Sequence, residues 1–115
     1  MNLWSKPKHP VPFELSEKDL SLLKKIGLQL HPALRIGFKE KVSTQVVAKS
    51  NAHLASDQII KVEFIKLTGK EIRACSKELA EKTASRLLGI HGNFVVLFRK
   101  HPGVSLNDIY NKSPF

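Results

Sequence analysis

Cysteine, tryptophan, tyrosine and methionine each occur only once in this chain of 115 residues. A single cysteine excludes an internal disulfide and a Cys-x-x-Cys metal site. Cys75 falls on the apolar side of an expected helix, so we expect a buried and inert thiol. No apolar run is long enough to cross a membrane, and the N-terminal residues lack a signal-peptide pattern. A cytoplasmic location is therefore expected; an organellar one is the open alternative, because a mature form would have lost any transit peptide.

The sequence also lacks the motifs of common enzyme and metal-site classes. Its five histidines show no spacing suited to a metal ion. No nucleophile elbow, phosphate-binding loop or dinucleotide fingerprint occurs. Glu78 and Glu81 lie on a charged helix face, where pairing with lysine is expected in place of acid–base chemistry. We therefore expect no enzymatic activity, no metal and no cofactor.

Acidic residues are few: ten of them stand against nineteen lysines and arginines, for a formal net charge of +9. Such an excess favours a polyanionic partner, above all nucleic acid, although a basic surface can also serve solubility alone. A hydrophobic content of 42% is normal for one globular domain. Three prolines indicate an extended arm at residues 1–14, where Trp4 would pin the arm to the domain or stack on a base.

Apolar periodicity and capping signals predict three helices and four strands in the order α-β-α-β-α-β-β. The helices are expected to begin after the N-caps Ser16, Ser43 and Thr68, and the strands to cover residues 33–36, 59–67, 86–91 and 94–99. Gly27 is expected to end the first helix as its C′ residue. This order predicts an α/β (α+β) domain at residues 15–101, with a compact two-layer architecture and a four-stranded mixed sheet.

Residues 102–115 are expected to be a poorly ordered C-terminal tail; the alternative is a short helix that docks through Leu106, Ile109 and Tyr110. On the third expected helix, Lys70, Arg73 and Lys77 form a basic stripe. A charged outward face is usual for a surface helix, so the stripe is only a weak candidate for a binding site.

Residues 34–44 are the main candidate site. They read as a strand that ends at Gly37, a lysine-bearing turn, and a helix that begins at Ser43. The first backbone N–H groups of a helix have no partner within it and attract phosphate. Lys39 and Lys41 in the turn strengthen that attraction. The candidate RNA-binding residues here are Arg35, Gly37, Phe38, Lys39, Lys41 and Ser43.

The chain resembles the CRM domain family (chloroplast RNA splicing and ribosome maturation), which includes the YhbY-like bacterial proteins. The resemblance is carried by Arg35-Ile-Gly-Phe-Lys-Glu-Lys-Val-Ser43, Ile60-Lys-Val62, Lys77-Glu-Leu-Ala80 and the hairpin Ile90-His-Gly-Asn-Phe-Val-Val-Leu-Phe-Arg99. It covers about residues 16–100. The chain departs from the G-x-x-G loop signature, because Glu40 or Lys41 replaces the second glycine in a loop one residue longer. Ala84-Ser85 stands where the family has Gly-Gly.

The resemblance implies an RNA-binding, non-enzymatic domain with a fold similar to the C-terminal domain of translation initiation factor three. It implies association with ribosomal RNA in precursors of the large ribosomal subunit, as an assembly or maturation factor; related plant domains assist intron splicing. Arg99 and Lys100 join the candidate residues because the family's terminal arginine falls at Arg99. We expect a monomer that binds RNA and no membrane. The alternative is a protein-interaction module whose basic face binds an acidic protein.

Overall fold

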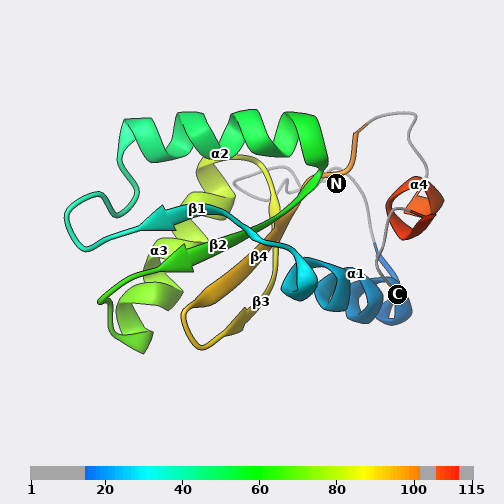
Figure 1. Ribbon diagram of the computed structural model, residues 1–115, viewed down its shortest axis with the longest axis horizontal. Coiled ribbons are helices and arrows are strands. Elements are labelled where there is room, and N and C mark those ends of the chain that lie inside the picture. The colour runs from blue at the N-terminus through cyan, green and yellow to red at the C-terminus, as the bar shows by residue number, and fades with distance from the viewer. Residues whose placement is uncertain (1–14, 102–105, 112–115) are drawn as a thin grey trace, which may run out of the picture.

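A computed structural model describes residues 15–101 and 106–111 of the chain (Figure 1). The expected arm at residues 1–14, with Trp4, lies outside these described residues. The elements follow in the order α1 (Glu17–Gln29), β1 (Pro32–Ile36), α2 (Thr44–Asp57), β2 (Ile59–Phe64), α3 (Gly69–Lys82), β3 (Arg86–His91), β4 (Phe94–Phe98) and α4 (Leu106–Asn111). The expected helices, strands and hairpin are therefore present, although β2 ends at Phe64 and not at residue 67. In the tail, α4 is the docking helix that was the alternative to a poorly ordered segment.

The four strands form one mixed sheet in the order β1-β2-β4-β3. β1 runs parallel to β2, with Leu34 opposite Val62, and α2 makes the connection between them. β4 is antiparallel to both of its neighbours, with Val95 opposite Val62 on one side and Ile90 on the other. Since β1 and β2 are parallel, the segments that follow them leave the same edge of the sheet.

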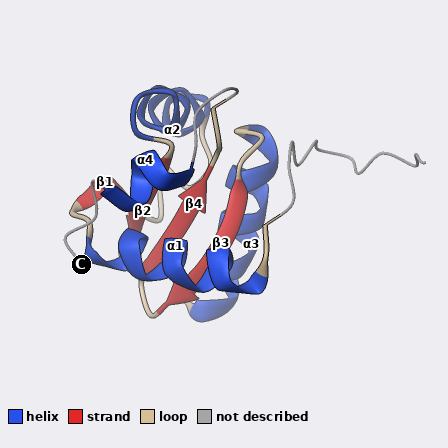
Figure 2. Cartoon of the chain, turned by 90° about the vertical axis from the view of Figure 1, so that its right-hand side faces the viewer, coloured by secondary structure: helices blue, strands red, loops and turns tan. Residues whose placement is uncertain are grey.

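Both faces of this sheet are covered by helices (Figures 1 and 2). On one face Ile60, Val62 and Phe64 pack with buried residues of α2 and α3. On the other face Ile59, Val96 and Phe98 pack with α1 and with Ile109 of α4. The α/β fold class is confirmed, but the expected two-layer arrangement is corrected to helix–sheet–helix. The cause is that β2 and β4 carry apolar side chains on both faces, and each face must be covered.

The hydroxyl groups that were expected to start the helices do so. Ser16 accepts a hydrogen bond from the N–H of Asp19 at 3.1 Å, and Ser43 accepts one from Val46 at 3.2 Å. Thr68 and Glu71 form a reciprocal capping box at the start of α3.

Gly27 does not end α1, which continues to Gln29. It is buried where α1 crosses the sheet, and a Cβ at this position would collide with Cγ1 of Val96 and lie 3.0 Å from Cγ2. Gly27 is thus a close-approach residue and not a C′ residue.

In the tail, α4 lies against α1 through Ile109 and through Tyr110, whose hydroxyl donates to Oδ1 of Asp19 at 2.7 Å. That bond, followed by those from Ser16, lowers the pKa of Asp19. Burial, with the bond to Asp19, raises the pKa of Tyr110 to about 12. Residues 102–105 and 112–115 lie outside the described chain.

Cys75 is buried in the core, as expected, and burial raises the pKa of its thiol. No described helix is long and apolar enough to cross a membrane.

Candidate nucleic-acid interface

The loop between β1 and α2 is held in shape by its own hydrogen bonds. The carboxylate of Glu40 accepts from the N–H of Gly37 at 2.9 Å. The N–H of Lys41 donates to the carbonyl of Gly37 at 3.1 Å, and the N–H of Ser43 donates to the carbonyl of Glu40 at 3.0 Å. These bonds close the turn immediately before α2. The loop therefore presents its side chains from a fixed backbone.

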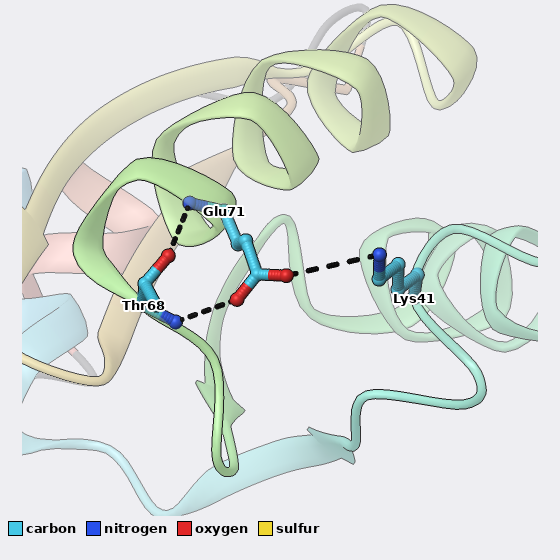
Figure 3. A network of polar contacts seen from close by, with 3 residues as sticks. All are labelled: Lys41, Thr68 and Glu71. Atoms are coloured by element: carbon cyan, nitrogen blue, oxygen red, sulfur yellow. Dashed lines mark hydrogen bonds and ion pairs between the residues drawn. The ribbon is translucent and has the colours of Figure 1, made fainter.

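Lys41 adopts a left-handed backbone conformation, with φ of 38°. Glycine is the residue that favours this region, so Lys41 bears a backbone strain that glycine would not. Its ammonium lies 3.8 Å from Oε2 of Glu71 at the start of α3 (Figure 3). The hydrogen bond from the N–H of Thr68 is the largest influence that lowers the pKa of Glu71, and Lys41 adds to it. Glu71 is therefore ionised at neutral pH and ties the loop to α3.

Phe38 lies in this loop directly after Gly37 and is its most exposed apolar side chain. It is 58% exposed, and no other large hydrophobic residue in the described part of the chain is exposed. The ammonium of Lys41 lies over its ring, 4.5 Å from the centroid, within the range of a cation–π contact.

Phe38 also borders a shallow, open hollow of about 600 Å³. Four cationic side chains and one carboxylate line this hollow: Arg35, Lys39, Lys49, Lys66 and Glu40. Lys39, Lys49 and Lys66 are exposed. Arg35 is 68% exposed at its side chain and pairs with Glu63 at 3.0 Å. With Glu63 counted beside Glu40, the four cations still leave an excess of two positive charges at the hollow, which favours a polyanion.

Lys49 and Lys66 were not among the residues expected from the sequence. Lys66 reaches the hollow because the N–H of Ile65, just after β2, donates to the carbonyl of Ile36 at the end of β1. Lys66 lies two residues beyond the end of β2, whereas the expected strand of residues 59–67 included it, so the sequence did not reveal its position at this end of the sheet. Lys49 reaches the hollow from the exposed side of α2, and only the orientation of that helix could have revealed it.

The expected residues divide into groups with different surroundings. Arg35, Gly37, Phe38 and Lys39 come together at the hollow, whereas Lys41 faces Glu71 and the Phe38 ring. The hydroxyl of Ser43 is occupied in capping α2.

Arg99 follows β4, where its guanidinium donates to Oδ1 of Asn51 at 3.0 Å and to the carbonyl of Thr83 at 2.7 Å. A further bond of 3.2 Å reaches the carbonyl of Asn51. These bonds tie β4 to α2 and to the end of α3. Arg99 and its neighbour Lys100 do not line the hollow.

The basic stripe of Lys70, Arg73 and Lys77 is exposed on α3, and none of these residues lines the hollow. In the described residues, no group of three or more His, Cys, Asp or Glu side chains could hold a metal ion.

The chain matches a known domain family over most of its length. The model of the CRS1/YhbY (CRM) domain family matches residues 15–99, most of the chain. The chain belongs to the CRM domain family. No match is found among curated protein sequences.

The CRM fold is also seen in a solved structure, the solution structure of a hypothetical protein from Staphylococcus aureus for which RNA binding has been proposed. The two chains superpose with a TM-score of 0.70 over 81% of this chain and 96% of that one. At 20% sequence identity, this likeness concerns the fold.

The two places where this CRM domain departs from the expected glycine pattern now have a structural explanation. Lys41 takes the left-handed conformation, so it is Lys41 and not Glu40 that occupies the backbone position suited to the second glycine of the loop. Ala84, which stands where a glycine was expected after α3, also has a positive φ, of 50°. Both positions therefore have a backbone conformation that glycine would adopt without strain.

Proposed function

We propose that this CRM domain binds structured RNA through the loop of residues 37–42 and the adjoining basic hollow. The observation that carries the proposal is the convergence of Arg35, Lys39, Lys49 and Lys66 from separate segments on one hollow. Membership of the CRM family supports RNA as the polyanion, as does the RNA binding proposed for the Staphylococcus aureus protein. The role is one of binding and not of catalysis.

The chemistry of the hollow suits phosphate contacts. Lysine and arginine side chains neutralise phosphates and release condensed counterions, so binding should weaken as salt increases. Such contacts position the RNA without reading its bases, and folded RNA is recognised largely through its shape and backbone. From the resemblance to the YhbY-like proteins, we further propose ribosomal RNA in precursors of the large subunit as the target, with this protein as a cytoplasmic assembly or maturation factor.

The direct test is a salt titration of binding to a fluorescently labelled RNA stem-loop, followed by anisotropy. The variant Lys39→Glu/Lys49→Glu reverses two charges at the hollow. Its matched control is Lys18→Glu/Lys25→Glu, which makes the same charge change at exposed positions of α1. Each lost phosphate contact should make the slope of log K against log salt shallower by about 0.7 to 0.9. We expect the hollow variant to lose about 1.5 from that slope and at least about tenfold in affinity, whereas the control stays close to the wild type.

Two results would contradict the proposal. Equal losses in both variants would mean that total charge, and not the hollow, drives binding. No RNA binding by the wild type at low salt would remove the RNA-binding role and favour the acidic-protein alternative, which a pull-down would then pursue.

The ribosomal target needs a separate test. We expect the wild-type protein to sediment with large-subunit precursors in a sucrose gradient and the hollow variant to remain at the top. A wild-type protein that binds stem-loops but stays at the top of the gradient would point to a different RNA.

A further inference from the structure

The feature that sets Phe38 apart is the cluster of cationic side chains around it, and not its exposure alone. Single exposed apolar residues are common on protein surfaces and need no explanation by themselves. Phe38, however, is an aromatic ring 58% exposed at the rim of a hollow lined by four cationic side chains. A flat apolar surface beside a set of cations matches the two parts of a nucleotide, its base and its phosphate.

The ring is also held in place. The loop bonds of Gly37, Glu40 and Lys41 fix the backbone on either side of Phe38. The ammonium of Lys41 lies over the ring at 4.5 Å from its centroid, and this lysine is tied in turn to Glu71. Phe38 lines the hollow and Lys41 does not. A preorganised ring loses little freedom when a ligand stacks on it.

The loop sequence explains why a side chain would take this role. Lys41 carries a Cβ at the position of the second glycine, with φ of 38°. A loop with glycine there lets a nucleic-acid backbone approach closely, and a side chain hinders that approach. Affinity lost at the loop backbone can be replaced by base stacking on Phe38 and by charge from Lys39.

We propose that Phe38 is a stacking platform for an unpaired base, and that Arg35, Lys39, Lys49 and Lys66 hold the phosphates next to that base. The preferred RNA would then contain a bulged or looped-out nucleotide beside a helix. This inference rests on the proposed RNA-binding function and specifies the RNA feature that it recognises. Stacking on an aromatic ring tolerates any base, so the preference concerns an unpaired base and not a sequence.

The test uses two labelled hairpin RNAs with the same stem, one with a single bulged adenosine and one fully paired. We expect the wild type to bind the bulged hairpin more tightly. Phe38→Ala should weaken binding to the bulged hairpin by about 5-fold to 100-fold and leave the paired hairpin within about twofold. The salt slope should not change, because no cation is removed. Phe38→Trp should keep the preference for the bulged hairpin. Phe38→Leu, whose side chain is apolar but has no π system, should lose it.

The outcomes separate this inference from the proposed function. If Phe38→Ala or Phe38→Leu keeps the wild-type preference, or if the wild type binds both hairpins equally, stacking is refuted while charge-driven RNA binding stands. If the wild type binds neither hairpin, both proposals fail. Because Phe38 is exposed, the variants should unfold at nearly the wild-type temperature, and a thermal melt of each confirms that the fold is intact.

Discussion

Replacing Gly27 with alanine tests how α1 is seated on the sheet. In an open helix interior this change would stabilise the protein by about 1 kcal/mol, because alanine has the higher helix propensity. Here the new methyl group would collide with Cγ1 of Val96 and lie 3.2 Å from its Cβ. Val96 is fully buried, and β4 is fixed between two neighbouring strands. Overpacking costs about 1–3 kcal/mol and takes its upper value where neither side can move.

The net expectation for Gly27→Ala is a loss of about 2 kcal/mol in the free energy of unfolding, or roughly 8 °C in the melting temperature. The assay is urea denaturation followed by circular dichroism, repeated in a Val96→Ala background. Val96→Ala alone should cost about 2–3 kcal/mol, since it removes two buried methyl groups and leaves a cavity. In that background the alanine at position 27 has room and partly fills the cavity. Gly27→Ala should then be neutral or stabilising by up to about 1 kcal/mol.

The sign reversal is the decisive observation, with a coupling energy of about 2–3 kcal/mol between the two positions. Gly69→Ala is a suitable control, because a Cβ there meets only Nη1 of Arg73 at an ordinary 3.7 Å. It should be neutral or slightly stabilising. If Gly27→Ala costs the same in both backgrounds, α1 does not cross the sheet at Val96 and the described packing is wrong.

Two further predictions concern Arg99 and Tyr110. Arg99→Lys should lower the free energy of unfolding by about 2–3 kcal/mol in urea titrations, because lysine cannot reproduce the bonds to Asn51 and Thr83. Its RNA affinity should stay at the wild-type level; the opposite result, full stability with lost affinity, would make Arg99 an RNA contact. Tyr110 is the only tyrosine, so the tyrosinate absorbance reports its ionisation directly. Its pKa in the folded protein should be about 12, and the variant Asp19→Asn should lower that pKa. The pKa of Tyr110 in the folded protein lies above the ordinary 10.0. The contribution of the protonated hydroxyl to the free energy of unfolding is therefore complete below pH 10 and disappears as the pH rises towards 12. A native midpoint near pH 10 would show that α4 is not docked.

The elements were predictable because their signals are local. A hydroxyl at the N-cap and a short run of apolar residues lie within a few positions of each other, and Ser43 and Thr68 start their helices as expected. The role of Gly27 could not be predicted from its neighbours in the sequence. The same residue can end a helix or permit close packing, and only its contact with Val96, 69 positions along the chain, decides between them. The expected two-layer arrangement was wrong for a similar reason. Whether the second face of the sheet is buried depends on where α1 packs, and that contact joins residues far apart in the sequence.

The candidate site was predictable in part. Arg35, Phe38 and Lys39 follow directly from the strand–loop–helix pattern and do lie together at the hollow. The other two cations come from segments that reach the hollow only through the parallel pairing of β1 with β2 and the orientation of α2. A sequence also cannot show that a cation already has a protein partner. Arg99 and Lys41 are both cationic, but in the fold Arg99 donates to Asn51 and Lys41 lies beside Glu71. These protein partners compete with RNA for the two side chains.

Lys41 connects the shape of the loop with its chemistry. A lysine with φ of 38° is strained relative to glycine, and in exchange its ammonium lies between the Phe38 ring and the carboxylate of Glu71. The capping bond from Thr68 lowers the pKa of Glu71, whose ionised carboxylate lies 3.8 Å from the ammonium of this lysine. Under the proposed stacking role, the strained backbone of Lys41 would serve to place a cation beside the Phe38 ring. In that proposed role, the loop would give up close contact between its backbone and the RNA backbone and gain an aromatic surface among cations, which suits an exposed nucleotide better than a regular duplex.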